Sequence, residues 1–175
     1  MKNLIIALFL LPTISLTKEF QNIEAKTIKG ETIKLSSLKG KAILFVNIAS
    51  RCGYTPQLES LQKLYDRYQD KGLTVVGIPS NDFGGQSPEK NADMAKFCKL
   101  NYGVNFPLLS KTSVKGPNKH PLFKFLINST KNKREISWNF EKFLVDNQGN
   151  LLNRFRSGDS PLGNKIISKI QQALK

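Results

Sequence analysis

Two cysteines, Cys52 and Cys98, are the residues of this 175-residue chain with the most distinctive chemistry. They lie 98 − 52 = 46 positions apart. In an exported protein such a pair often forms a structural disulfide, so this alternative stands until the surroundings of each cysteine are considered. The single histidine, His120, precedes Pro121 and is interpreted as a surface residue or the start of a helix. With so few ligands, neither a metal site nor a histidine-activated nucleophile is expected.

The position of Cys52 favours a reactive thiolate. It follows a compact apolar run over residues 41–49 and precedes a segment with helical spacing. Unpaired N–H groups and the positive end of a helix dipole stabilise an anion at such a junction, and Arg51 adds a neighbouring cation. Reactive crevices in α/β sheets also lie at the carboxyl ends of parallel strands. Because Thr55 occupies the fourth place where a Cys-x-x-Cys motif has its second cysteine, single-thiolate chemistry is favoured over dithiol exchange.

The spacing of apolar and turn-forming residues predicts the elements around the two cysteines. Expected strands form a hairpin within 20–35, buried strands at 41–49 and 73–79, a short strand at 106–109, and a second hairpin from 140–145 and 151–155. Expected helices are one with its apolar face over 58–68 that ends at Lys71-Gly72, and others over 88–99, 121–127 and 161–174; 81–88 is a loop. This order describes an α/β fold in which a central mixed β-sheet has helices on both faces, preceded by an N-terminal β-hairpin.

Three stretches become informative when they are taken together. They are Asn-Ile-Ala-Ser-Arg-Cys-Gly-Tyr-Thr at 47–55, Asn-Asp-Phe-Gly-Gly-Gln at 81–86, and Trp-Asn-Phe-Glu-Lys-Phe-Leu-Val-Asp at 138–146. Each closely resembles a motif of the glutathione peroxidase family, in the family's order and at similar spacing. The resemblance extends from about Phe20 to the C-terminal helix. It implies a thioredoxin-like fold and a cysteine-type, non-selenium peroxidase.

The resemblance implies a catalytic tetrad of Cys52, Gln86, Trp138 and Asn139. The two amides and the indole carry N–H donors, which stabilise a thiolate and can bind the departing peroxide oxygen. Taken singly, each donor also has a structural interpretation: Trp138 as core filling, Gln86 as a loop residue, Asn139 as a turn or cap residue. Their joint occurrence with Cys52 favours the catalytic interpretation.

Cys98 matches the position at which thioredoxin-dependent members of the family carry a resolving cysteine. The resemblance therefore implies that Cys52 is oxidised to a sulfenic acid, that Cys98 condenses with it to a disulfide, and that an external thiol restores both. Glutathione or a thioredoxin-like protein would be a co-substrate, and no bound cofactor is expected. Ser80 stands where many such relatives have a further cysteine, and the short stretch at 128–137 resembles the monomeric branch.

The N-terminus resembles an export signal. Met1-Lys2-Asn3 is followed by an apolar run over 4–11 that is too short to span a bilayer as a helix. We therefore expect a signal peptide at 1–17, one domain at 18–175, a periplasmic or secreted location, and no stable membrane insertion after cleavage. The formal net charge of +14 is spread along the chain, so a solvated basic surface is expected rather than a nucleic-acid site.

The sequence thus predicts a thiol-dependent peroxidase that reduces hydrogen peroxide and organic or lipid hydroperoxides in defence against oxidative stress. Two alternatives stay open. One is an exported thiol-disulfide exchange protein, against which the missing Cys-x-x-Cys counts. The other is a basic, disulfide-stapled module that binds anionic envelope surfaces, against which the set of donors at Gln86, Trp138 and Asn139 counts.

Overall fold

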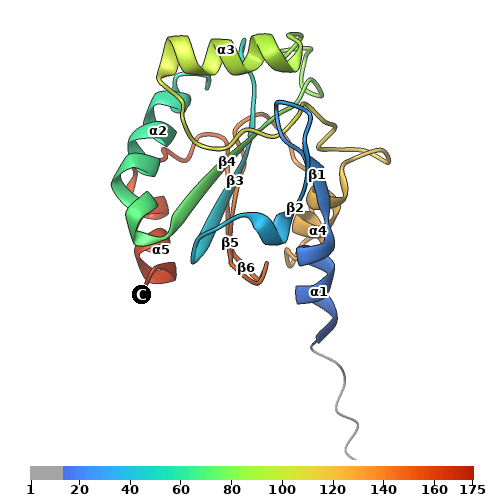
Figure 1. Cartoon of the computed structure of the whole chain (residues 1–175), viewed down its shortest axis with the longest axis vertical. Helices are drawn as coiled ribbons and strands as arrows, with labels where there is room; N and C mark the ends of the chain where they lie inside the picture. Colours follow the sequence, from blue (N-terminus) through green and yellow to red (C-terminus); the bar gives the residue numbers. More distant parts are fainter. Residues whose placement is uncertain (1–13) are drawn as a thin grey trace, which may run out of the picture.

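The computed structural model of the chain describes residues 14–175, with side chains described from residue 18 onward. Its elements follow one another as α1 (Ile14–Asn22), β1 (Glu24–Lys26), β2 (Thr32–Lys34), η1 (Leu35–Ser37), β3 (Ala42–Ile48), α2 (Gln57–Tyr68), η2 (Gln69–Lys71), β4 (Leu73–Pro79), α3 (Asn91–Tyr102), α4 (Pro121–Asn128), β5 (Lys142–Asp146), β6 (Leu151–Phe155) and α5 (Asn164–Ala173). Figure 1 shows this order along the chain.

A four-stranded sheet in the order β4-β3-β5-β6 forms the centre of the fold. β3 pairs in parallel with β4 and antiparallel with β5, and β5 pairs antiparallel with β6. All seven residues of β3 are buried, as expected for a strand that is covered on both faces. The separate pair β1-β2 forms the predicted N-terminal hairpin, whose turn contains Gly30 at φ 94°. The predicted mixed sheet is confirmed.

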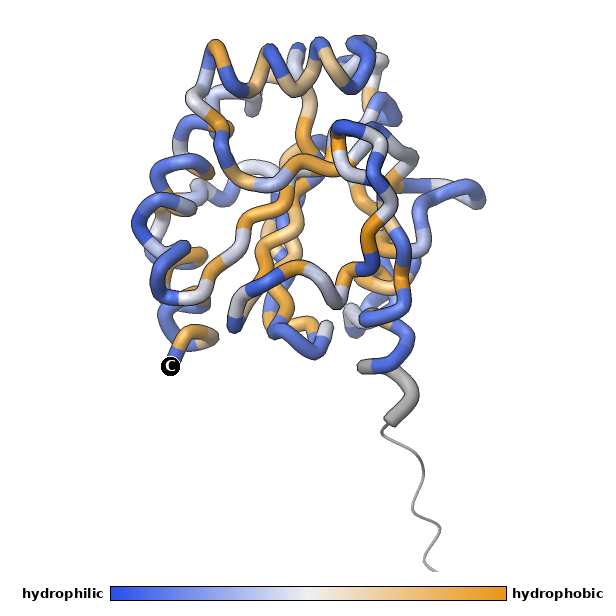
Figure 2. Tube along the Cα trace, in the orientation of Figure 1, coloured by the Kyte–Doolittle hydropathy of each residue, from blue (hydrophilic) through white to orange (hydrophobic). Residues whose placement is uncertain are grey.

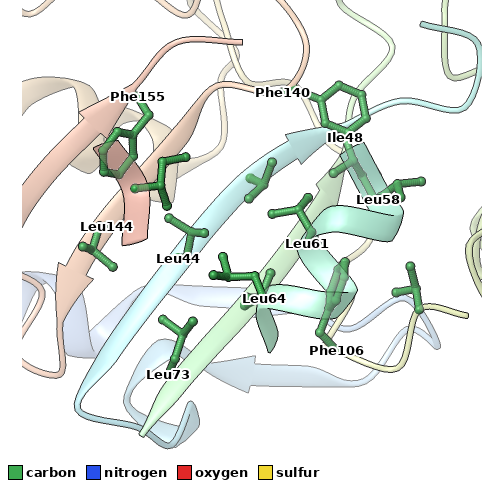
Figure 3. Packing of buried hydrophobic residues seen from close by; sticks show 14 of the residues in the cluster. Leu44, Ile48, Leu58, Leu61, Leu64, Leu73, Phe106, Phe140, Leu144 and Phe155 are labelled. Carbon is green, nitrogen blue, oxygen red and sulfur yellow. The ribbon is translucent and has the colours of Figure 1, made fainter. Parts of the chain in front are cut away.

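Alternate residues of β3 pack into two hydrophobic clusters, one on each face of the sheet. Leu44, Val46 and Ile48 face α2 and α5, whereas Ile43 and Phe45 face α1 and α4. In Figure 1, α2 and α5 lie on one side of the sheet, α1 and α4 lie on the other, and α3 crosses one end. The strands form the most hydrophobic part of the trace in Figure 2, and Figure 3 shows Leu44 and Ile48 of β3 packed near the leucines of α2.

The predicted short strand at 106–109 is wrong. This segment makes only isolated bridges, Leu108 to Gly77 of β4 and Leu109 to Thr27 beside the hairpin. Pro107 has no N–H to donate, and its carbonyl accepts the Gly77 N–H at 3.0 Å. The segment therefore joins the edge of β4 to the hairpin without becoming a strand.

Two predicted helix bounds also shift. α3 starts at Asn91 rather than residue 88, because Lys111 Nζ donates to the carbonyls of Ser87, Pro88 and Glu89 and holds that segment outside the helix. α5 covers 164–173 rather than 161–174. His120 is confirmed at a helix start: it is half-buried, and its Nδ1 accepts the Leu122 N–H at 3.2 Å as the N-cap of α4.

The predicted signal peptide falls mostly outside the described residues. Its expected boundary at residue 17 lies within α1, whose later residue Phe20 is buried against Phe45 and Phe125. Within residues 14–175, no helix is both long enough and apolar enough to cross a membrane. The export signal therefore stays a prediction from the sequence.

Candidate active site

Cys52 lies in a tight turn that follows the carboxyl end of β3. The Thr55 hydroxyl accepts the Cys52 N–H at 3.0 Å and donates to the Ala49 carbonyl at 2.9 Å. The Thr55 N–H in turn donates to the Cys52 carbonyl at 2.9 Å. Thr55 therefore fixes the turn from its interior, which gives a structural reason for threonine at the place where a dithiol motif has its second cysteine.

The sequence placed Cys52 between a buried strand and a helix with its apolar face from Leu58, and the structure agrees. α2 begins at Gln57, five positions after Cys52, because Pro56 opens the helix after the turn. Within the described part of the chain, the N–H that reaches the Cys52 sulfur is that of Tyr54, at 3.5 Å. The sulfur thus receives a hydrogen bond from the turn itself. A donor in this position favours the thiolate over the thiol.

Arg51 is paired with a carboxylate instead of standing free beside the sulfur. Its Nε lies 3.0 Å from Glu89 Oε1, and the Ser50 hydroxyl donates to Glu89 Oε2 at 2.5 Å. Burial raises the pKa of Glu89, but the hydrogen bonds from Ser50, from its own backbone and from Arg51 outweigh burial and lower that pKa overall. The predicted cation is therefore largely neutralised by a residue 38 positions away.

Gln86 and Asn139 are brought together although they lie 53 positions apart. Asn139 Nδ2 donates to Gln86 Oε1 at 2.9 Å, and Asn139 is fully buried. The carbonyl of Gln86 accepts the Arg51 N–H at 3.0 Å, so the Gln86 loop is joined to the residue before Cys52. Because Asn139 occupies the Gln86 oxygen, the amide NH₂ of Gln86 is oriented as the free donor of the pair.

Trp138 lies beside this pair and is 40% exposed, so it does not serve as core filling. Its ring lies 5.7 Å from that of Phe83, measured between centroids. Its carbonyl accepts the Asn47 side-chain amide at 3.1 Å, and the Asn47 carbonyl accepts the Phe140 N–H at 2.7 Å. Asn47 of β3 therefore holds the turn that carries Trp138 and Asn139.

Asn47 and Glu141 are residues of the site that sequence reasoning did not identify. Asn47 carried a signal, because a polar side chain inside an otherwise apolar strand needs a buried partner. Glu141 stands inside the motif at 138–146, but its partners Ser137, Arg134 and Arg154 could not be read from that motif. Phe140, between Asn139 and Glu141, adopts φ 65°, an uncommon conformation for a bulky residue. The polypeptide is therefore held in a strained turn beside the candidate donors.

Glu141 holds the segment that leads into this turn through hydrogen bonds from Ser137. It is 1% exposed and accepts both the Ser137 N–H and the Ser137 hydroxyl at 2.7 Å. Arg154 lies 2.7 Å away, and Arg134 lies 3.3 Å away. Burial raises the pKa of Glu141, but the hydrogen bonds from Ser137 and Arg154 and the charge of Arg154 outweigh it, so the pKa lies below the ordinary value of 4.5.

We expect Glu141→Ala to lower the free energy of unfolding by about 3–5 kcal/mol, because it leaves the largely buried guanidinium of Arg154 without its carboxylate partner. Since the folded pKa is depressed, the contribution of Glu141 is present above pH 4.5 and is lost as the pH falls through the folded pKa. Urea denaturation at pH 7 and at pH 3 measures both effects. The control is Glu59→Ala, which removes an exposed partner of Lys63 and should cost less than about 1 kcal/mol. Equal losses for the two variants would contradict this role.

Cys98 lies in the middle of α3 and is fully buried. It shares one hydrophobic cluster with Cys52, and both are free thiols. Burial raises the pKa of Cys98 to about 12, and the charge of Glu89 acts in the same direction. Cys98 is therefore protonated at neutral pH in this conformation, and its own helix keeps it from reacting.

The order and pairing of the elements define the class of fold. The same arrangement of elements occurs in a thioredoxin-family thiol:disulfide interchange protein from Chlorobium tepidum, at 19% identity and a TM-score of 0.61 over 87% of this chain and 93% of that one. At that identity the likeness concerns the fold alone. It confirms the predicted thioredoxin-like fold.

The family model described as "Glutathione peroxidase" matches residues 20–127. The glutathione peroxidase homolog BsaA of Staphylococcus epidermidis is 48% identical over 83% of this chain and 92% of its own length. The glutathione peroxidase-like peroxiredoxin 2 of Saccharomyces cerevisiae is 44% identical over 91% and 99%. The crystal structure of Trgpx in its apo form superposes with a TM-score of 0.70 at 32% identity, over 89% and 94%.

The chain belongs to the glutathione peroxidase family. It is an enzyme of the peroxidase class, as the sequence predicted. The roles of its individual residues are a separate question, which rests on the geometry described above.

Proposed function

We propose that the Cys52 thiolate attacks a hydroperoxide and is oxidised to a sulfenic acid. The sulfur forms a bond to the terminal peroxide oxygen, the O–O bond breaks, and the departing oxygen takes up a proton to leave as water or an alcohol. The observation that carries the proposal is the turn itself, in which the Tyr54 N–H reaches the sulfur and the Arg51 N–H joins the turn to the carbonyl of Gln86. The test is hydroperoxide consumption by the reduced protein supplied with dithiothreitol.

Gln86, Trp138 and Asn139 are proposed to supply the donors for this step. Asn139 orients the Gln86 amide, and Trp138 offers an indole N–H from an exposed position. Donors aimed at the departing oxygen act where negative charge develops, so they accelerate the step itself. Trp138 is the only tryptophan, so its fluorescence reports on the surroundings of the site.

We expect Gln86→Ala and Asn139→Ala each to slow Cys52 oxidation by roughly 10²-fold. Because the two amides act through one hydrogen bond, the double variant should be little slower than either single variant. Stopped-flow fluorescence of Trp138 after mixing with hydroperoxide gives the rate constant. Gln148→Ala, in the distant turn between β5 and β6, is the control and should react at the unmodified rate. Two effects that multiply fully in the double variant would contradict a shared role.

Cys98 is proposed to resolve the sulfenic acid. Its sulfur attacks the Cys52 sulfur, a disulfide forms, and the hydroxyl group leaves as water. The two sulfurs can bond only when their Cα atoms come within about 7 Å, and a fully buried thiol in mid-helix must first be released. Only Met94 and Cys98 of the twelve residues of α3 are buried, against five of twelve in α2, so local unwinding of α3 costs little packing.

The reductant is proposed to be an external thiol, either a thioredoxin-like protein or glutathione, acting as a co-substrate. It would reduce the Cys52–Cys98 disulfide and restore both thiols. One relative of this chain, at 43% identity, is named hydroperoxy fatty acid reductase in Synechocystis, which supports organic hydroperoxides as substrates here. Turnover rates measured with each of three reductants (dithiothreitol, thioredoxin and glutathione) and each of two substrates (hydrogen peroxide and an organic hydroperoxide) would rank the combinations of reductant and substrate.

We further propose that the protein acts as an exported monomer. The apolar run at 4–11 supports export, and the short connection at 128–137 supports a monomer. The spread of the positive charge supports the absence of a nucleic-acid partner. Fractionation of the expressing cells and light scattering of the purified protein test location and oligomeric state separately.

A further inference from the structure

Lys142 of β5 is a fully buried lysine at the end of the sheet near the Cys52 turn. Its Nζ donates to Gln57 Oε1 at 2.6 Å and to the carbonyls of Asp159 at 2.8 Å and Ser157 at 3.1 Å. These three partners satisfy the three N–H donors of an ammonium group. A buried cation is costly to maintain, so its retention calls for a reason other than stability.

Three hydrogen bonds, linked through the covalent chain of Gln57 and Tyr54, connect this ammonium to the Cys52 sulfur. Lys142 holds the side chain of Gln57, which is the first residue of α2. The backbone N–H of Gln57 donates to the Tyr54 carbonyl at 2.9 Å. The N–H of Tyr54 then donates to Cys52 Sγ at 3.5 Å.

A second contact joins Gln57 to the same loop that Lys142 contacts. Gln57 Nε2 donates to the Ser157 carbonyl at 2.8 Å, so the loop after β6 is tied both to Lys142 and to α2. A Cβ atom added at Gly158 of that loop would lie 3.6 Å from the Tyr54 hydroxyl. Lys142 therefore lies where β5, the start of α2 and the loop at 157–159 meet around Tyr54.

We propose that Lys142 is a positioning residue for the Cys52 thiolate, acting through Gln57 and the Tyr54 N–H. This proposal rests on the proposed function, because it assumes that Cys52 reacts as a thiolate. Lys142 holds the side chain of Gln57, and the Gln57 N–H holds the carbonyl of Tyr54, the residue whose N–H donates to the sulfur. Without the ammonium, the Tyr54 N–H is free to move away and the thiolate loses its donor.

The described contacts place five charged groups near Lys142 or Cys52: Asp159, Glu141, Lys165, Arg51 and Glu89. Burial lowers the pKa of Lys142 to about 7, and the nearby carboxylates of Asp159 and Glu141 act in the opposite direction. The ion pair of Arg51 with Glu89 flanks Cys52. The substitutions used below leave all of these groups in place, so a change in the pH profile of Cys52 reports on Lys142.

The test is the rate at which iodoacetamide alkylates Cys52 between pH 4 and pH 10, with Cys98→Ser as the background. We expect Lys142→Met to raise the midpoint of the profile by about one pH unit, so that alkylation at pH 6 is roughly tenfold slower. Gln57→Met, which cuts the link to α2 but leaves Lys142 its backbone acceptors, should give the same shift. Gln62→Met is the matched control, because Gln62 is a buried residue of α2 that bonds Asn105 away from the turn.

Profiles of Lys142→Met and Gln57→Met that coincide with the Gln62→Met profile would overturn the proposal. If Lys142→Met does not fold, as judged by circular dichroism, Gln57→Met decides alone. Alkylation requires no peroxide, so the result is separable from the proposed function. An unmoved profile together with an inactive Cys52→Ser variant rejects only the positioning role, whereas a Cys52→Ser variant with full peroxidase activity rejects the proposed function.

Discussion

Cys52→Ser is expected to reduce hydroperoxide consumption to the uncatalysed background, a loss of at least roughly 10³-fold. A serine hydroxyl stays protonated at neutral pH and is a poor nucleophile toward an O–O bond, so the donors around the turn have no thiolate to stabilise. The measurement is the disappearance of hydrogen peroxide and of an organic hydroperoxide with dithiothreitol as reductant.

The fold should tolerate this substitution, which makes the result easy to interpret. Cys52 is 8% exposed, serine is nearly the same size, and Thr55 bonds the backbone of residue 52 and leaves its side chain free. Circular dichroism and urea denaturation of the variant should match those of the unmodified protein within about 1 kcal/mol. A folded Cys52→Ser variant that retains more than a tenth of the activity would remove Cys52 from the chemistry.

Cys98→Ser is expected to leave the oxidation of Cys52 unchanged but to lower thioredoxin-supported turnover by roughly 10²-fold or more. The first step uses the Cys52 turn, which this substitution does not touch. Reduction by a thioredoxin requires a disulfide as its substrate, and without Cys98 the sulfenic acid has no partner within the chain. Pre-steady-state oxidation rates and steady-state turnover, measured on the same preparations, separate the two steps.

Leu100→Ser is a matched control for that experiment. Leu100 lies two positions further along α3 and is 70% exposed, so its replacement alters the same helix without removing a thiol. Its turnover with thioredoxin should stay near that of the unmodified protein. Equal turnover of Cys98→Ser and Leu100→Ser would show that Cys98 is not the resolving residue, and a direct reductant such as glutathione would then be favoured.

Local patterns along the chain were sufficient for the central elements of the fold. Apolar runs over 41–49 and 73–79 predicted β3 and β4 because strands covered on both faces need continuous apolar sequence. The start of α3 was placed too early because it depends on Lys111, which holds three carbonyls from 22 to 24 positions away. The segment at 106–109 was assigned as a strand because its composition fits one, but Pro107 has no N–H to donate, and Leu108 and Leu109 make only isolated bridges.

The candidate site divides in the same way. Cys52, Gln86, Trp138 and Asn139 were identified from motifs, and the structure joins Gln86 to Asn139 and to the turn of Cys52. The residues that position these side chains were not identified. Glu141 is bonded by Ser137 and Arg154, and Lys142 donates to α2 and to the loop after β6. Such contacts depend on the tertiary fold, and no spacing in one sequence encodes them.

The pairing of Arg51 with Glu89 illustrates how a correct local expectation can change its meaning. A cation does lie next to Cys52, but its charge is shared with a carboxylate that also raises the pKa of Cys98. Within the described residues, the donor that reaches the Cys52 sulfur is the Tyr54 N–H. In the proposed function, the thiolate is therefore stabilised mainly by a hydrogen bond, and this bond depends on the geometry of the turn.

The most direct test is to identify the sulfur that a hydroperoxide oxidises first. Reduced Cys98→Ser protein is mixed with one equivalent of hydroperoxide in the presence of dimedone, and the modified cysteine is located by mass spectrometry of its peptides. We predict one dimedone adduct per chain on Cys52, and in the unmodified protein a Cys52–Cys98 disulfide in its place. A Cys98→Ser protein that consumes hydroperoxide without a dimedone adduct on Cys52 would contradict the account.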